Sequence, residues 1–143
     1  MAERTVRNVH VHLTTQITQD DKTDRYTIDE DGQAVKIGDK FYIRYHESKR
    51  DNAKVTLKIN NDHIMIKRKP GEEFPSSQME FSSVEDQHFS YPTRWGNIEM
   101  LSQTNMMDVQ LDEKPLSGRV NLDYSLHSGN NLVGNYKLRL IFK

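Results

Sequence analysis

The sequence has no cysteine among its 143 residues. Disulfides, catalytic thiolates and zinc sites with cysteine ligands are therefore excluded. Long apolar runs are also missing: residues 1–13 are polar where a secretory signal would be apolar, and no stretch reaches the length of a membrane span. The chain has the size of one domain, so we expect a single domain over residues 1–143 and a cytoplasmic location.

Familiar catalytic and nucleotide-binding motifs are absent as well. G-x-S-x-G, the P-loop, H-E-x-x-H and G-x-G-x-x-G do not occur. The acidic segment 18–32 lacks the spaced ligands, central glycine and final glutamate of a calcium-binding EF-hand loop, which favours a solvated hairpin. The sequence therefore favours a protein that has no cofactor and is not an enzyme, although it does not exclude enzymatic activity. A hydrolase or isomerase that uses His88, Tyr91 and Arg94 is the weakest alternative.

What the sequence does contain is a two-residue alternation of apolar and polar side chains. Val9, Val11 and Leu13 are separated by histidines, and a period of two indicates strands with one buried face. Helical periodicity is weak. The same alternation, complete or in short runs, recurs over residues 41–45, 55–59, 64–66, 79–81, 89–91, 98–100, 120–126 and 136–142. Turn-forming residues separate the runs at 29–32, 37–39, 60–62, 69–73, 113–118 and 128–131.

These runs and turns predict an all-β fold: a single closed antiparallel meander barrel of about ten strands. Closure removes the unpaired edges of such a long meander. Within residues 54–71, a two-residue loop at Asn60 and Asn61 would pair Leu57 with Ile64, and Val55 with Ile66. The interior of such a barrel is either filled by side chains or wide enough for a small ligand.

A series of residues in the C-terminal half carries a family resemblance. The series consists of an apolar strand ending in Arg68, then Gly71, Met79, Phe81, a Y-x-T at Tyr91 and Thr93, then Gly96, Thr104, Gly118 and Tyr124. Over residues 60–142 this order resembles the YwiB-like proteins of Firmicutes, small uncharacterised barrels with a calycin (lipocalin-like) fold. The resemblance implies a closed meander barrel and no established activity. The lipocalin G-x-W motif near the first strand is absent, so lipocalin ligand binding is not transferred.

Charge is unevenly distributed along the chain. The net charge of -1 argues against a general nucleic-acid binder. Residues 36–69, however, hold ten Lys or Arg against four Asp or Glu, and the rest of the chain holds ten against seventeen. A basic outer face within residues 36–69 is therefore the alternative hypothesis, in which the protein is an adaptor for nucleic acid or an anionic protein. The residues expected on that face are Tyr42, Arg44, Lys54, Lys58, Lys67 and Lys69.

Arg68 is the first candidate for a site, because it shares a strand face with Ile64 and Ile66. It could grip a ligand carboxylate or phosphate inside the barrel. It could also pair with a carboxylate or with free carbonyls at the strand end and close the barrel mouth, and burial favours this second reading.

Other candidates carry the same two readings. The loop with Tyr91, Thr93, Arg94 and Trp95 could form one wall of a binding site, or simply reverse the chain, which we favour. Ser102 and Thr104 share a face with apolar neighbours; they could bond a ligand, although bonds to each other or to water are favoured.

The favoured hypothesis is a barrel that holds a small, partly apolar ligand with an acidic group. Its candidate binding residues are Arg68, Tyr91, Thr93, Trp95, Ser102, Thr104 and Tyr124. His10 and His12 share a strand face and could ligate a metal with His46 or His63, but exposed histidines are the favoured reading and we predict no metal site.

Overall fold

The alternating segments fold as strands throughout. The computed structural model describes residues 4–71 and 75–143, and in this part of the chain it contains ten strands and no helix. The strands are β1 (Arg4–Gln19), β2 (Lys22–Ile37), β3 (Lys40–Glu47), β4 (Ala53–Ile59), β5 (His63–Lys69), β6 (Ser77–Ser82), β7 (Gln87–Thr93), β8 (Gly96–Glu113), β9 (Leu116–Ser128) and β10 (Asn131–Phe142). The described residues include no helix that is long and apolar enough to cross a membrane.

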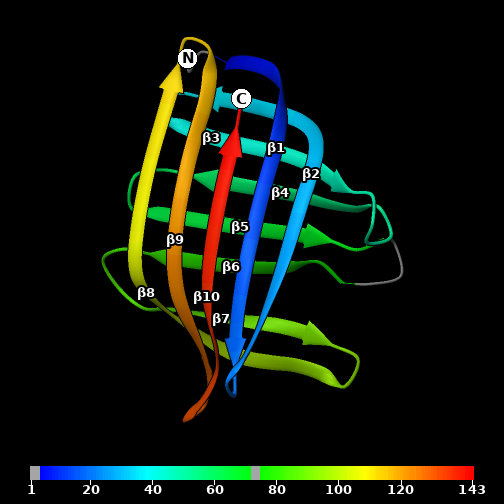
Figure 1. Cartoon of the computed structure of the whole chain (residues 1–143), viewed down its shortest axis with the longest axis vertical. Helices are drawn as coiled ribbons and strands as arrows, with labels where there is room; N and C mark the ends of the chain where they lie inside the picture. The colour runs from blue at the N-terminus through cyan, green and yellow to red at the C-terminus, as the bar shows by residue number, and fades with distance from the viewer. Residues whose placement is uncertain (1–3, 72–74) are drawn as a thin grey trace.

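All ten strands belong to one antiparallel sheet in the order β6-β5-β4-β3-β2-β1-β10-β9-β8-β7. The long strands β1, β2, β8, β9 and β10 run along the length of the molecule, and the short strands β3 to β6 cross behind them (Figure 1). β2 and β8 connect the two layers. Residues 32–37 of β2 pair with β3, and residues 96–102 of β8 pair with β7.

The two edge strands, β6 and β7, pack against each other and bring the two edges of the sheet together. The Ser102 hydroxyl on β8 donates a hydrogen bond of 2.7 Å to the Glu80 carbonyl on β6 at this junction. No ladder joins β6 to β7 in the described parts of the chain, so the barrel is nearly closed. The predicted all-β, calycin-like meander of about ten strands is confirmed.

The side chains that point into the barrel fill one half of it and leave the other half open, and we call these the packed half and the hollow half. Val11, Leu122 and Leu140 are fully buried in the packed half, among further aliphatic and phenyl side chains. Four residues away along β1 and β10 from Val11 and Leu140, Thr15 and Tyr136 instead line a cavity. The alternation predicted from the sequence thus places the inward faces correctly, and the interior is both filled and hollow.

The predicted register of the β4–β5 hairpin is wrong by two residues. Leu57 pairs with Ile66, and Val55 pairs with Arg68. The loop is longer than two residues because Asn60 does not adopt the left-handed conformation. Its side-chain oxygen instead accepts a hydrogen bond from the Asp62 amide at 3.2 Å, and its own amide donates to the His63 carbonyl at 3.0 Å. A shift of two residues keeps each side chain on its predicted face.

The predicted turn at residues 29–32 is also wrong, because β2 runs through it without a break. Gly32 instead allows β2 to lie close to β3, because a Cβ at this position would lie 2.4 Å from the Arg44 carbonyl oxygen on β3. The chain reverses at Asp20 and Asp21, which both have positive φ and form a two-residue hairpin loop. The predicted turn at 69–73 lies partly outside the described residues.

Candidate functional site

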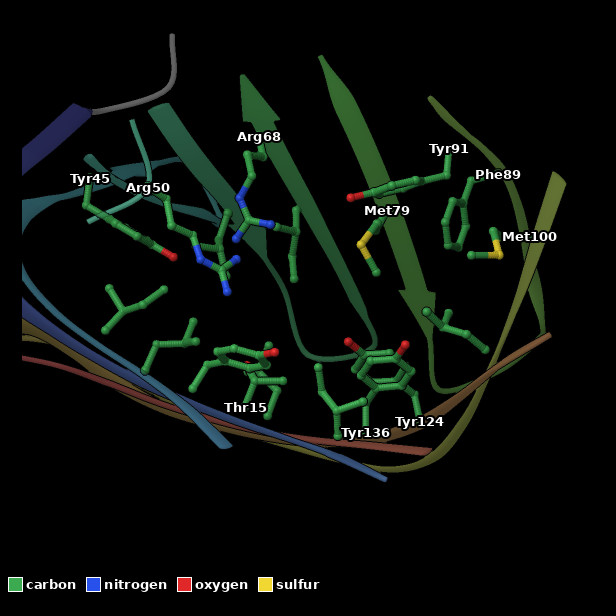
Figure 2. A pocket seen from close by; sticks show the side chains of 18 residues that line it. Thr15, Tyr45, Arg50, Arg68, Met79, Phe89, Tyr91, Met100, Tyr124 and Tyr136 are labelled. Carbon is green, nitrogen blue, oxygen red and sulfur yellow. The ribbon is translucent and has the colours of Figure 1, made fainter. Parts of the chain in front are cut away.

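The hollow half of the barrel encloses a cavity of about 370 Å³. Every one of the ten strands contributes to its wall, together with the turn between β3 and β4 (Figure 2). The lining residues are Leu13, Thr15, Ile17, Tyr26, Ile28, Tyr45, Arg50, Leu57, Ile66, Arg68, Met79, Phe89, Tyr91, Met100, Tyr124, Leu126, Tyr136 and Leu138. Most are apolar, and the polar groups are few, as in small-molecule sites of other proteins.

Arg68 faces the cavity from β5 and is held by Glu47 at the end of β3. Its Nε donates to Glu47 Oε1 at 2.6 Å, and its Nη2 donates to Oε2 at 3.2 Å. The Glu47 side chain is only 2% exposed, whereas Arg68 is 30% exposed. This two-pronged bond satisfies the carboxylate and neutralises the guanidinium, so the structure supports the pairing interpretation of Arg68.

Arg50 provides a second guanidinium, which sequence reasoning missed. It lies in the turn between β3 and β4, where its amide donates to the Glu47 carbonyl and its carbonyl accepts from the Ala53 amide, both at 3.0 Å. Asp51 and Asn52 have positive φ, which closes the turn. The Arg50 guanidinium carbon lies 5.1 Å from the centre of the Tyr26 ring, a cation–π contact. No carboxylate among the described residues forms an ion pair with Arg50.

Stacked tyrosines form one side of the cavity. The rings of Tyr124 and Tyr136 are parallel, with centroids 4.8 Å apart, and Phe81 packs behind Tyr124 at 4.3 Å. Their hydroxyl groups point into the cavity (Figure 2). Burial raises the pKa of both tyrosines, and that of Tyr45, so these phenols stay protonated at neutral pH and can donate hydrogen bonds.

The two ends of the cavity differ in chemistry. Arg50, Arg68 and Tyr45 cluster at one end, and Phe89, Met79 and Met100 lie toward the other (Figure 2). Thioether side chains adapt to irregular apolar shapes and pack well against rings. The cavity therefore offers charge and hydrogen-bond donors at one end and a deformable apolar wall at the other.

Only some of the predicted site residues come together here. Arg68, Tyr91 and Tyr124 line the cavity, while Thr93 lines a separate outer pocket that shares Arg68 and Tyr91 with it. Trp95 is 91% exposed and does not reach the cavity. The Thr93 hydroxyl explains this placement, because it donates to the Gly96 carbonyl and accepts from the Trp95 amide, which ties the β7–β8 turn outside the barrel.

Ser102 and Thr104 do not line the cavity either. The Ser102 hydroxyl is used in the bond to β6 that helps to close the barrel. The Thr104 hydroxyl oxygen is buried and has no hydrogen-bond partner in the described parts of the chain. It lies next to the bulge at Asn105, where the pairing of β8 with β9 shifts by one residue. The two hydroxyls therefore do not bond each other, and the other half of the favoured reading, a bond to water, stays a prediction.

The outer face of the β1–β2 hairpin carries a cluster of histidines and aspartates. His12 Nδ1 lies 2.6 Å from Asp29 Oδ1, and the two ring nitrogens of His10 lie 3.2 Å from Asp31 and Asp29. Hydrogen bonds to Asp31 and Asp29 raise the pKa of His10, and those from His12 and His10 lower the pKa of Asp29. Within residues 4–71 and 75–143, no three His, Asp or Glu side chains are arranged to hold a metal ion.

Comparison with known proteins identifies a family and a fold. Residues 11–140 match the family model described as "Domain of unknown function (DUF1934)", so the chain belongs to this family. The crystal structure of the YwiB protein from Bacillus subtilis is similar, with a TM-score of 0.80 and 17% sequence identity over 96% of this chain and 92% of that chain. The predicted YwiB-like resemblance is thus confirmed. A search of curated proteins finds no match.

Proposed function

We propose that this member of the DUF1934 family binds a small amphipathic anion inside its barrel. The observation that carries the proposal is the polarity of the cavity: Arg50, which forms no ion pair with a carboxylate of the described residues, lies at one end, and Met79 and Met100 form the other. Such an arrangement matches a molecule with one acidic group and an apolar body. Function is argued from this site, because a barrel fold by itself does not specify one.

The volume of the cavity limits the size of the ligand. An apolar cavity of about 150 Å³ is large enough for benzene. The cavity here, about 370 Å³, therefore suits a ligand with roughly two or three rings, or a chain of similar bulk. The stacked pair Tyr124–Tyr136 adds a flat aromatic wall and two phenol hydroxyls, which favours a planar body with a hydrogen-bond acceptor.

The charge at the basic end favours a monoanion. Arg50 and Arg68 contribute two positive charges and Glu47 one negative charge, which leaves one positive charge. A single carboxylate or sulfonate balances that charge, whereas a dianion would place an uncompensated negative charge near the buried Glu47. The protonated hydroxyl of Tyr45 is available as a further donor.

The placement of His88 supports binding over catalysis. His88 is exposed and alternates with Phe89 on β7, so it lies on the face of the strand opposite Tyr91, which lines the cavity. The three residues of the enzymatic alternative, His88, Tyr91 and Arg94, therefore do not share one site. A general base within hydrogen-bonding reach of a ligand would be required for that reaction class.

Two fluorescent probes with similar ring systems test the proposal. Anilinonaphthalene sulfonate carries an acidic group, and N-phenylnaphthylamine does not; both increase in fluorescence in an apolar site. We expect the sulfonate to bind more tightly, by about tenfold, because a hydrogen bond to a charged group contributes about 1.5–3 kcal/mol net and Arg50 is exposed, which places the effect at the lower end of that range. Arg50→Met should remove this preference and leave binding of the neutral probe unchanged.

Matched variants make the result specific to the cavity. Lys49→Met removes the same charge from the same turn at a residue that does not line the cavity, and it should change neither probe. Met100→Trp fills the apolar end and should weaken both probes. The proposal fails if the sulfonate has no advantage in the unmodified protein, or if Lys49→Met lowers its affinity as much as Arg50→Met does.

A further inference from the structure

The outer face of the short strands carries a basic patch, which we define as Tyr42, Arg44, Lys54, Lys58, Lys67 and Lys69. Their strands β3, β4 and β5 are neighbours in the sheet. The ladder sets Tyr42 opposite Lys58, places Lys54 opposite Lys69, and aligns Arg44 with Lys67 through Thr56 between them. Side chains on one face lie about 4.8 Å apart across strands and about 7 Å apart along a strand, so five cations gather on one small surface.

The cations of the basic patch are not neutralised by their neighbours. None of the five forms an ion pair with a carboxylate of the described residues. The next strand, β6, presents Gln78 opposite Lys67 and Glu80 opposite Met65, and Glu80 lies 3.9 Å from His63. Like charges that face each other across strands are mildly destabilising, so Lys54 and Lys69 accept a small cost for which packing gives no reason.

The net charge of the chain conceals this asymmetry. The whole chain carries -1, so with five positive charges in the basic patch the remainder carries -6. A molecule of this kind attracts a polyanion to one face and repels it from the others, which fixes the orientation of the complex. The net charge of -1 therefore does not exclude nucleic acid from this face.

We propose that the basic patch binds single-stranded nucleic acid. A polynucleotide carries regularly spaced charge, which suits a two-dimensional array of cations. Tyr42 is half-buried among those cations and offers a ring on which a base can stack, as on other single-strand-binding sheets. An anionic membrane fits less well, because no exposed large hydrophobic side chain of the described residues lies on β3, β4, β5 or β6. This site is independent of the cavity, since its side chains lie on the opposite face of the sheet.

A titration of the full chain with a labelled single-stranded RNA of about 12 nucleotides, a length within the range that small domains cover, tests the proposal. With five cations engaged, the slope of log K against log salt should be about -3.5, so affinity should fall about 100-fold between roughly 50 and 200 mM salt. The double variant Lys58→Gln, Lys67→Gln should reduce the slope to about -2. Tyr42→Leu should weaken binding about tenfold with little change in slope.

A control double variant, Arg119→Gln with Lys137→Gln, removes the same charge from exposed positions on β9 and β10 in the other layer. It should leave RNA affinity within about twofold, since like charges beyond a Debye length are screened. The proposal is overturned if RNA does not bind at about 50 mM salt, or if the control variant weakens binding as much as the patch variant. It is also overturned if phosphatidylserine vesicles or polyglutamate bind and RNA does not, which would reassign the surface to a membrane or an acidic protein.

Discussion

The packed and hollow halves of the barrel are built from the same strands, and they differ in what the inward rows carry. On β10, Leu140 and Phe142 fill the packed half, while Tyr136 and Leu138 line the cavity. On β9 the row likewise changes from Val120 and Leu122 to Tyr124 and Leu126. Aliphatic side chains interdigitate without voids. The hollow half contains groups that cannot collapse on one another, and this keeps it open.

Two groups of side chains resist collapse in the hollow half. Arg68 is held by Glu47, so its guanidinium cannot move further into the lumen without leaving the buried Glu47 carboxylate unpaired. The rings of Tyr124 and Tyr136 are stacked on each other, and their hydroxyl groups need polar partners. The cavity is therefore a property of residue choice within a uniform barrel, because the backbone pattern is continuous through both halves.

The largest expected effect comes from truncating the same residue type in the two halves. Leu140 is 0% exposed in the packed half, and Leu138, two residues earlier on the same face, is 3% exposed and lines the cavity. Leu140→Ala leaves a new void and should lower the free energy of unfolding by about 3–5 kcal/mol. Leu138→Ala only enlarges an existing space and should cost about 2 kcal/mol. Urea denaturation measures both, and equal losses would contradict the division into halves.

A smaller effect is expected at the ion pair, and it should be asymmetric. Arg68→Met leaves the buried Glu47 carboxylate without its partner, and should cost about 2–3 kcal/mol, less than a fully buried pair because Arg68 is partly exposed. Glu47→Gln leaves a guanidinium that can turn toward water at the mouth, and should cost about 1 kcal/mol. The measurement is again urea denaturation at neutral pH. If Glu47→Gln costs more, the pair does not hold the cavity open in the way described.

The smallest effect is expected on the outer face, where the ion pairs are exposed. The pKa of His10 is raised above 6.5, so its contribution to stability is present below that pH and is lost as pH rises through the raised value. The pKa of Asp29 is lowered below 3.8, so its contribution is present above that pH and is lost as pH falls through the lowered value. Both contributions to stability are therefore fully present between pH 3.8 and pH 6.5, the ordinary pKa values of Asp29 and His10.

Asp29→Asn sharpens this contrast between outer face and lumen. In an NMR titration the pKa of His10 should fall toward 6.5, with Asp31 retaining part of the shift because it makes the larger contribution. Probe binding in the cavity should be unchanged, since Asp29 is on the outer face. An unchanged pKa of His10 would show that the hydrogen bonds to Asp29 do not persist in solution.

Sequence reasoning predicted the barrel because alternation is a local property. Each inward row, such as Val9, Val11 and Leu13, is determined by neighbours two residues apart, and the strands need only pair in order. Pairing registers depend on loop conformation, and an Asx turn at Asn60 takes the place of the predicted two-residue turn, because an Asn side chain can serve either. A register error of two residues leaves every side chain on its predicted face, so the prediction of the fold remained correct.

The candidate site was less predictable, because alternation does not predict a buried charge or the conformation of a turn. Glu47 continues the inward row of Phe41, Ile43 and Tyr45, so its position was available from parity, and only its charge concealed it. Arg50 belongs to a turn, where no periodicity applies. The positive φ angles of Asp51 and Asn52 reverse the chain after it, and the Arg50 guanidinium lies over the Tyr26 ring. Trp95 is predicted as a site residue because its loop mixes aromatic and polar side chains, but aromatic character does not determine the direction in which a side chain of a tight turn points, and Trp95 faces solvent.

A crystal structure of the protein with anilinonaphthalene sulfonate would show whether the hollow half is an amphipathic anion site. The account predicts one probe molecule in the lumen, with a sulfonate oxygen about 2.7–3.2 Å from a nitrogen of Arg50 and its rings between Met79, Met100 and Tyr124. A probe bound only on the outer surface, with the lumen closed by its own side chains, would contradict it.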